Sequence, residues 1–410
     1  MNKITNDIIY TGINDFTTDL FESHYPIPNG VTYNSYVILD EKTMVVATMA
    51  EGFADEWMDK VREALNGRNP DYLLIQHMEP DHSATLDRFM KSYPETIVVA
   101  SKPAINMMVN YYGTDYAGRN LIIKDGDTLC LGKHELVFVG APMIHWPEVM
   151  MAYDKEDKVL FSADAFGRFG APLDHSLDGA SAEYEAEEWL TEARRYYIGI
   201  VGKQGDSVKK AFAKIAELDN LETRIICALH GPVLTHDLTK YFDVYMKWAT
   251  YTPEEEGVAI CYSSVYGHTK EAVQMLAATL KELYKGIGHC DSHAAPPVEV
   301  IDLARCDLSA AVACAFRYNK VVLATTTYYN DIFPCMKDFI NHLKYSAFQN
   351  RKVALIENGS WAPKAAAGMK ALLEECPGIE YCEASVSIKS AMTDANKEQV
   401  LALAKELIGR

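Results

Sequence analysis

The sequence lacks any apolar run that approaches the roughly 18 residues of a membrane-spanning helix. Residues 1–7 also lack the basic start and the apolar core of a secretory signal peptide. The 410-residue chain has 49% hydrophobic and 23% charged residues, which is the composition of a globular protein with two or three domains. We therefore expect a cytoplasmic protein with no membrane partner.

Positive charge is scarce in this chain. It has 39 lysine and arginine residues against 57 aspartate and glutamate residues, which gives a net charge of -18. Such a surplus of negative charge repels phosphate backbones and anionic lipids. We therefore expect no nucleic-acid partner.

Paired cysteines are also missing. The nine cysteines include no Cys-x-x-Cys pair, which argues against a zinc ribbon, a rubredoxin-type iron site and a redox disulfide motif. Most of them are expected to be small core residues in a reducing compartment.

One short stretch is rich in metal-binding side chains. Residues 77–82, His-Met-Glu-Pro-Asp-His, hold two imidazoles and two carboxylates in six positions. The apolar run 72–75 before them predicts a strand, and the apolar spacing after them predicts a helix. Glu79 and Asp81 place like charges close together at the end of a buried strand, which is unfavourable without a cation. The stretch therefore predicts a metal-binding loop rather than a solvated polar turn.

Three later strand-like runs each lead to one more candidate ligand. The runs are 135–139, 158–163 and 224–229, and the residues that follow them are, in the same order, His145, Asp164 and His230. In a layered α/β fold, loops at one edge of the sheets face a common cleft, so residues far apart in sequence can converge there. We expect these residues to complete the metal site.

The pattern of elements divides the chain into two parts. The first contains an expected β-hairpin within 36–48 and a helix at 183–197, which we interpret as a solvated helix face and not as a site. Residues 252–257 combine proline, glycine and a charge run, and they are the predicted linker. The expected domains are therefore 1–251 and 258–410.

Beyond residue 258, strand and helix patterns alternate strictly. Strands are expected at 258–262, 298–301, 320–324, 352–356 and within 380–388, and helices at 270–285 and 394–408. Such alternation predicts a doubly wound parallel sheet, in which ligands bind at the carboxyl ends of the strands.

Three loops at these strand ends carry candidate cofactor ligands. The first is Ser263, Ser264, Val265, Tyr266, Gly267, His268 and Thr269; the second is Thr325, Thr326, Thr327, Tyr328, Tyr329 and Asn330; the third is Asn358, Gly359, Ser360 and Trp361. Hydroxyl groups, a glycine and backbone amides at a helix start can hold a phosphate without lysine or arginine. The first loop resembles the flavodoxin phosphate loop, which implies that FMN is bound here, with aromatic side chains of the later loops stacked on its ring system.

Over essentially its full length the chain resembles a flavodiiron protein, also called an A-type flavoprotein, of the rubredoxin:oxygen oxidoreductase and nitric oxide reductase family. The resemblance implies an α/β fold, with an N-terminal metallo-β-lactamase-like αββα sandwich and a C-terminal flavodoxin-like doubly wound parallel sheet. Glu79 stands where metallo-β-lactamases have the second histidine of His-x-His-x-Asp-His, and a carboxylate there suits iron over zinc. The second flavin loop and Tyr266 depart from the family pattern, which leaves the individual FMN contacts open.

The family pattern also implies a set of metal ligands, which are the expected catalytic residues. One iron would be bound by His77, Glu79 and His145 and the other by Asp81, His82 and His230, with Asp164 bridging. Whether His82 binds iron stays open, because the corresponding histidine is not a ligand in every member of the family.

The resemblance implies an enzyme that passes electrons from a separate donor, a rubredoxin-like protein, through FMN to a non-haem diiron centre. The expected reactions are reduction of O2 to water, of NO to N2O, or of both. A head-to-tail homodimer or a dimer of dimers is implied, in which the FMN of one subunit lies near the irons of another.

Two other classes of function compete with this interpretation. A dinuclear zinc hydrolase of the metallo-β-lactamase type with an accessory flavodoxin-like domain is opposed by Glu79 and the flavin loops. An electron carrier without metals is opposed by the complete ligand set. The sequence leaves open the preference between O2 and NO, the donor, the oligomer beyond a dimer and the role of His175.

Overall fold

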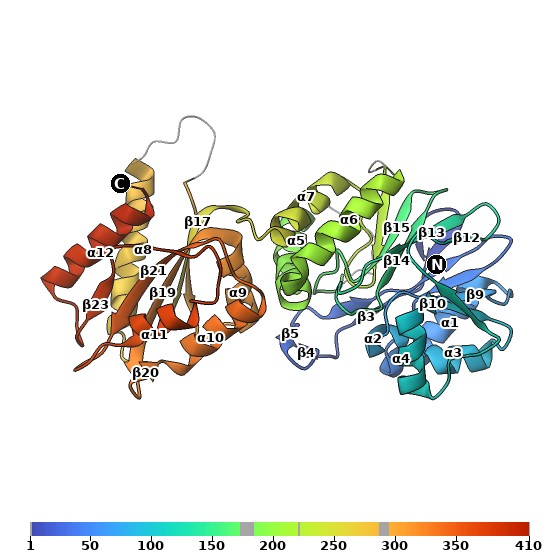
Figure 1. The fold of residues 1–410 in the computed structure, drawn as a ribbon, viewed down its shortest axis with the longest axis horizontal. Helices are drawn as coiled ribbons and strands as arrows, with labels where there is room; N and C mark the ends of the chain where they lie inside the picture. Colours follow the sequence, from blue (N-terminus) through green and yellow to red (C-terminus); the bar gives the residue numbers. More distant parts are fainter. Residues whose placement is uncertain (1, 173–183, 220–221, 287–294, 410) are drawn as a thin grey trace. The chain divides into compact units, whose positions relative to one another are not determined.

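The computed structural model describes residues 2–172, 184–219, 222–286 and 295–409. It divides into two compact units, Met1–Ala249 and Thr250–Arg410 (Figure 1). His175, whose role the sequence left open, lies outside the described residues. Within the described part of the chain, no helix is long and apolar enough to cross a membrane.

The amino-terminal unit contains two large sheets. The first consists, in spatial order, of β1 (Asn2–Lys3), β2 (Ile8–Tyr10), β7 (Tyr36–Ile38), β8 (Met44–Val46), β9 (Tyr72–Ile75), β10 (Ile97–Ser101) and β11 (Asn120–Ile123). The second consists of β12 (Thr128–Cys130), β13 (Glu135–Gly140), β14 (Met150–Asp154), β15 (Val159–Ala163) and β16 (Ile225–Ala228). Two short ribbons pair β3 (Ile13–Asp15) with β6 (Val31–Tyr33) and β4 (Leu20–Phe21) with β5 (Tyr25–Pro26).

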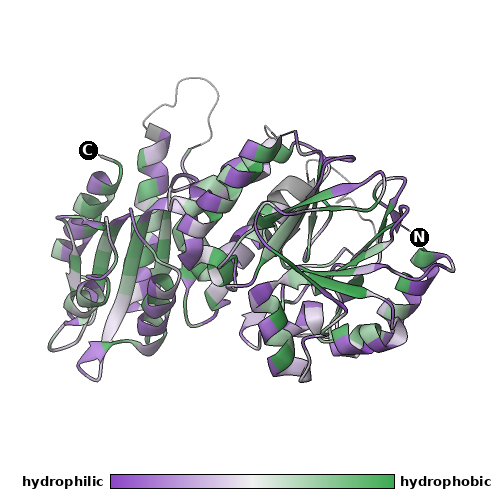
Figure 2. Cartoon of the chain, turned by 45° about the vertical axis from the view of Figure 1, so that its right-hand side comes forward, coloured by the Kyte–Doolittle hydropathy of each residue, from purple (hydrophilic) through white to green (hydrophobic). Residues whose placement is uncertain are grey.

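The two sheets pack face to face through alternating apolar side chains. Leu74 of β9 belongs to the core between the sheets, together with Phe138 of β13 and Phe161 of β15. Leu73 belongs to a second core on the other face of the first sheet, because successive strand residues point to opposite faces. The strands are accordingly among the most hydrophobic segments in Figure 2.

Helices cover both outer faces of this sandwich (Figure 1). On the first sheet lie α1 (Ala54–Leu65), α3 (Leu86–Ser92) and α4 (Lys102–Tyr112), whose buried faces share one core with that sheet. The other side carries α5 (Tyr184–Tyr196), α6 (Gly205–Asp219) and α7 (Leu238–Ala249). The expected αββα arrangement is confirmed.

The interpretation of residues 183–197 as a solvated helix was wrong. Trp189, Ala193 and Tyr196 of α5 are all buried, and their spacing of four and three residues places them on one face of the helix. The many charged residues between them concealed this apolar face. Tyr196, moreover, packs beside one of the predicted metal ligands, as described below.

The carboxy-terminal unit is built around a parallel sheet. Its central strands lie in the order β18 (Val298–Asp302), β17 (Glu255–Tyr262), β19 (Tyr318–Tyr328), β21 (Lys352–Asn358) and β22 (Glu380–Tyr381), with β23 (Val386–Ile388) also on β21 and the short antiparallel β20 (Asp331–Ile332) on β19. Its helices are α8 (His268–Gly286), α9 (Leu308–Arg317), α10 (Pro334–Tyr345), α11 (Ala365–Leu372) and α12 (Asp394–Leu407). The strand order reverses next to β17, as in doubly wound folds that bind a cofactor at this point.

The linker predicted at 252–257 overlaps the first strand of the carboxy-terminal unit, because β17 begins at Glu255. The charges of this segment are paired with the same unit, Glu255 with Arg317 at 2.5 Å and Glu256 with Lys320 at 2.8 Å. A charge run that suggested an exposed linker is thus the start of a strand. A register shift between Glu255 and Val258 accommodates its pairing with β19.

Candidate metal centre

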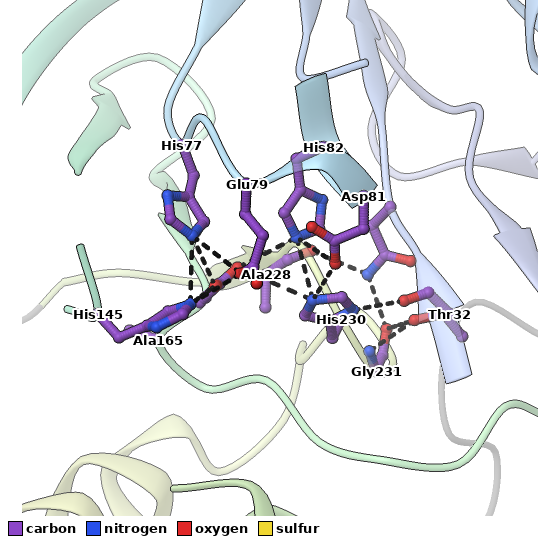
Figure 3. Close-up of polar contacts among 12 residues, drawn as sticks. Thr32, His77, Glu79, Asp81, His82, His145, Ala165, Ala228, His230 and Gly231 are labelled. Carbon is purple, nitrogen blue, oxygen red and sulfur yellow. Dashed lines mark hydrogen bonds and ion pairs between the residues drawn. The ribbon is translucent and has the colours of Figure 1, made fainter. Parts of the chain in front are cut away.

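The predicted ligands of the amino-terminal unit meet at one edge of its two sheets. His77 and Glu79 follow β9, and Asp81 and His82 lie on the short helix α2 (Pro80–Ser83). The remaining three are His145 from the β13–β14 connection, Asp164 directly after β15, and His230 two residues after the end of β16. In Figure 3 the labelled ligand side chains point toward a common centre; they are His77, Glu79, Asp81, His82, His145 and His230.

The first group of donors surrounds one point. His77 Nε2 and His145 Nε2 are 3.2 Å apart, and Glu79 Oε2 lies 3.3 Å from the former and 2.9 Å from the latter. Asp164 Oδ2 lies 3.4 Å from His77 Nε2 and 3.2 Å from His145 Nε2. Donors bound to one metal at about 2.1 Å are themselves about 3.0–3.4 Å apart, so this spacing suits a single cation.

The second group is built in the same way. His82 Nε2 and His230 Nε2 are 3.0 Å apart, and Asp81 Oδ2 lies 3.3 Å from each of them. Asp164 Oδ1 lies 3.3 Å from His82 Nε2 and 4.0 Å from His230 Nε2. His82 therefore points into the site.

Asp164 joins the two groups, because its two carboxylate oxygens face different donor sets. This buried carboxylate can bridge two cations, each with its own imidazoles and its own terminal carboxylate. The donor set contains four imidazoles and three carboxylates and no thiolate, which suits iron better than a soft metal.

Buried carboxylate oxygens without hydrogen-bond partners also indicate that this site holds two cations. Asp81 Oδ1, Asp81 Oδ2 and Asp164 Oδ1 are buried and accept no hydrogen bond from any described residue. Burying carboxylate oxygens that accept no hydrogen bond is unfavourable. Two bound cations would remove this penalty, so the residues present fit a dinuclear metal centre.

Groups behind the ligands fix the orientation of two imidazoles. His77 Nδ1 donates to Glu148 Oε1 at 2.7 Å, and the same oxygen accepts the Met78 backbone N–H at 2.8 Å. His230 Nδ1 donates to the Thr32 carbonyl oxygen at 2.7 Å. Because Nδ1 carries the proton in both rings, the lone pair of Nε2 points at the metal position.

The acid–base state of the site links metal binding to pH. Burial alone would lower the pKa of His145, but Asp164 and Glu79 outweigh it and raise that pKa to about 9. Burial of His77 is likewise outweighed by Asp164, Glu148 and Glu79, so its pKa also lies well above the usual range. Without metal, both rings therefore hold an extra proton at neutral pH.

We expect metal affinity of the metal-free chain to rise with pH up to about 9. Each proton that must leave an imidazole weakens the apparent affinity about tenfold for every pH unit below its pKa. Anaerobic titration with Co²⁺ against a competing chelator at several pH values measures the effect. An affinity that stays constant between pH 6.5 and 8.5, after correction for the chelator, would contradict it.

Three aromatic side chains that sequence reasoning missed enclose His230. Their ring centroids lie 5.2 Å (Phe21), 5.6 Å (Tyr196) and 5.9 Å (Tyr33) from the centroid of the imidazole. Burial, followed by the charges of Asp164 and Glu79, holds the pKa of Tyr196 well above its ordinary value, so its hydroxyl stays protonated. No sequence motif predicts a role for these residues, because single aromatic residues in strands and helices are normally core residues.

Trp146 lies next to one of the predicted ligands. Trp146 packs against His77, with ring centroids 5.2 Å apart. His24 is exposed and stacks edge-on with Tyr25, whose hydroxyl donates to the Gly199 carbonyl oxygen at 2.9 Å.

Hydroxyl groups link the first predicted flavin loop to the second, and the second to the segment that follows the third. Ser263 Oγ and Thr325 Oγ1 are 2.5 Å apart, and Thr327 Oγ1 accepts the Lys364 backbone N–H at 2.8 Å. Thr325 to Tyr328 belong to β19 and were wrongly expected as loop residues, because the sheet pairs further along the strand than the apolar run indicated.

The loop residues differ in what they offer a ligand. Those with buried side chains or backbone are Ser263, Thr269, Thr325, Asn358 and Gly359. The exposed ones are Val265, Tyr266, Gly267, His268, Tyr328, Tyr329, Asn330, Ser360 and Trp361, while Ser264, Thr326 and Thr327 are half-buried. Trp361, Tyr266 and Tyr329 are each about nine-tenths exposed, at 90%, 91% and 89%, which leaves broad aromatic surfaces at this strand edge.

Comparison with known proteins agrees with the family resemblance drawn from the sequence. Residues 31–231 match the family described as ODP family beta lactamase. The chain is 28% identical over 391 residues to the anaerobic nitric oxide reductase flavorubredoxin of Citrobacter koseri, covering 94% of this chain and 77% of that protein.

Two solved structures share the whole fold. Rubredoxin oxygen:oxidoreductase from Desulfovibrio gigas superposes with a TM-score of 0.87 and 23% identity over 100% of both chains. The flavodiiron protein from Giardia intestinalis superposes with a TM-score of 0.86 and 23% identity, covering 99% of this chain and 96% of that one. The resemblance to flavodiiron proteins deduced from the sequence motifs is confirmed, since this chain is similar over nearly its whole length to proteins of that type.

Proposed function

We propose that this chain reduces O2 to water, NO to N2O, or both, at a diiron centre held by His77, Glu79, Asp81, His82, His145, Asp164 and His230. The observation that carries the proposal is the position of Asp164, whose two oxygens face two separate sets of donors. Such an arrangement favours two metal ions close enough to act on one small molecule.

The chain's own residues hold and shield the reacting centre. His77 and His230 are fixed by Glu148 and by the Thr32 carbonyl, so neither ring has to reorient when a metal binds. Phe21, Tyr33 and Tyr196 keep water away from the His230 side. The protonated hydroxyl of Tyr196 can donate a hydrogen bond on this side, since no described residue accepts from it.

When bound, FMN supplies two electrons and two ferrous irons supply two more, which together equal the four that reduce O2 to water, whereas reduction of two NO to N2O needs two. The loops around Tyr266, Tyr328, Tyr329 and Trp361 are the proposed flavin site. Their exposed rings could stack on the isoalloxazine, and Ser264 and the start of α8 would hold the phosphate.

The decisive experiment is metal and flavin analysis followed by gas addition. We expect about two irons and one FMN in each anaerobically purified chain. After anaerobic reduction, rapid reoxidation of the flavin by O2 or by NO, added separately, identifies the preferred substrate. Zinc in place of iron, with no flavin, would instead support the hydrolase alternative.

We expect Gly267→Val to release FMN and leave the irons in place. Gly267 has φ +99°, a conformation that a β-branched residue strongly disfavours, and nothing lies within 4 Å of the position its Cβ would take. The new side chain would both strain the loop and occupy open space beside the proposed phosphate site. FMN content and affinity are measured by fluorescence titration, with at least about a tenfold loss of affinity expected.

The matched control for this variant is Gly118→Val. Gly118 also has a positive φ, +82°, and open space around its Cβ position, but it belongs to the amino-terminal unit. Full FMN binding by Gly267→Val, or equal loss in both variants, would contradict the assignment of the phosphate loop.

Two further points rest on the same proposal. Electrons come from a separate rubredoxin-like donor, and two chains associate head to tail so that the flavin of one serves the irons of the other. Light scattering at micromolar concentration tests the association, and stopped-flow reduction by a purified rubredoxin tests the donor. The cytoplasmic location stays a prediction from the sequence.

A further inference from the structure

A second cluster of metal-binding side chains lies at the other end of β15. His134 stands between β12 and β13, Asp154 is the last residue of β14, and Asp157 lies in the turn before β15. Asp164 follows the opposite end of β15. Since a strand rises about 3.3 Å per residue, the two clusters are roughly 15–20 Å apart and do not share ligands.

The three side chains of this cluster converge on one region. His134 Nδ1 lies 3.1 Å from Asp154 Oδ2, and the Asp157 backbone N–H donates to that same oxygen at 3.0 Å. One donor atom from each of His134, Asp154 and Asp157 can be chosen so that all lie within 4.8 Å of one another. Small movements of the side chains would bring them to the spacing of the ligands described above.

These titratable side chains are unusually well buried. His134 and Asp154 are both 0% exposed. Asp154 Oδ1 and Asp157 Oδ2 are buried and receive no hydrogen bond from any described residue. A protonated His134 would satisfy Asp154 Oδ2 through Nδ1, but it leaves these two carboxylate oxygens without a partner, which is unfavourable in a buried position.

A further carboxylate stands behind the imidazole. Asp7 Oδ2 lies 3.5 Å from His134 Nε2 and is itself held by Lys133 Nζ at 3.1 Å. Histidines that bind metals commonly direct their other ring nitrogen at a carboxylate. With the proton on Nε2 toward Asp7, the lone pair of Nδ1 points at Asp154 and the open carboxylate oxygens.

We propose that His134, Asp154 and Asp157 bind one divalent transition-metal ion, separate from the diiron centre. One imidazole nitrogen with carboxylate oxygens favours ions such as Zn²⁺, Fe²⁺ or Mn²⁺ over Mg²⁺ or Ca²⁺, which prefer oxygen ligands alone. The ion has a structural role, because it ties the β12–β13 turn to the β14–β15 turn. It neither adds to the proposed reaction nor depends on it.

The test uses the full chain with its diiron centre already filled with iron. Zn²⁺ is titrated against a competing indicator, and bound zinc and iron are counted in the same sample. We expect one zinc per chain in addition to the irons, lost in Asp157→Asn and His134→Gln. Glu156→Gln is the matched control, since it removes the same charge one position away from a side chain that is 44% exposed, and it should bind zinc like the original chain.

A second readout covers the case in which His134→Gln does not fold. Asp157 is only half-buried, so Asp157→Asn should fold, and Zn²⁺ should raise the melting temperature of the original chain and of Glu156→Gln but not of Asp157→Asn. Failure of the original chain to bind zinc with its irons retained would overturn the proposal. Equal zinc binding by Asp157→Asn and the original chain would overturn it as well.

Discussion

Replacing Asp164 with alanine is expected to abolish turnover with both O2 and NO while FMN stays bound. The carboxylate faces both donor sets, with Oδ2 3.2 Å from His145 Nε2 and Oδ1 3.3 Å from His82 Nε2. Its removal leaves the imidazoles without their shared negative charge and without the group that fixes the separation of two metals. Loss of activity by more than about 100-fold is expected, together with loss of iron.

The experiment measures three quantities on one preparation, namely iron content, FMN content and the rate of gas consumption with reduced donor. Asp206→Ala is the control, because Asp206 lies on the surface in the first turn of α6 and pairs only with Lys209 among the described contacts. An Asp164→Ala chain that keeps substantial activity with either gas would refute the diiron assignment. Loss of FMN as well would indicate general misfolding rather than a local effect.

Replacing Glu148 is expected to cause the second largest loss of metal binding and activity, although its side chain is not one of the predicted ligands. Its Oε1 accepts both the His77 Nδ1–H and the Met78 backbone N–H, and the residue is buried. Glu148→Ala leaves two buried donors unpaired and frees the His77 ring to turn. Removal of such an orienting group typically weakens metal binding or activity by about 10–100-fold.

Glu148→Gln separates the orienting role from the charge. The amide oxygen of glutamine can still accept the His77 proton, so we expect metal affinity in the order glutamate, glutamine, alanine. Lower stability of Glu148→Ala, by about 1–3 kcal/mol, follows from the unpaired donors. Glu135→Ala, an exposed glutamate paired with Lys155, is the control. Equal metal affinity in all four chains would show that Glu148 does not position His77.

Much of the site could be predicted from the sequence because its ligands follow recognisable strands. The strand predicted at 72–75 is β9, and the hairpin predicted within 36–48 is formed by β7 and β8. The strands predicted after residue 258 form a parallel sheet, and strands and helices alternate along the chain as expected. These features are local, since the periodicity of apolar residues sets strands and helices within a few residues.

Two expectations from the sequence were wrong for physical reasons. Charged residues around Trp189 and Tyr196 hid a buried helix face, and the charges at Glu255 and Glu256 suggested a linker where their partners Arg317 and Lys320 stabilise a strand. In each case the deciding contact involves another element. A single segment read by itself carries no information about that partner.

From the sequence alone one can predict the types of candidate ligand, their order along the chain and the two-unit α/β architecture. Three features appear only in the folded chain: Asp164 faces both donor sets, His82 turns toward His230, and Glu148 holds His77. His77 and Glu148 are 71 positions apart in the sequence, and His82 and His230 are 148 positions apart. These contacts exist because two sheets pack face to face and bring their strand ends to one edge, which no local pattern specifies.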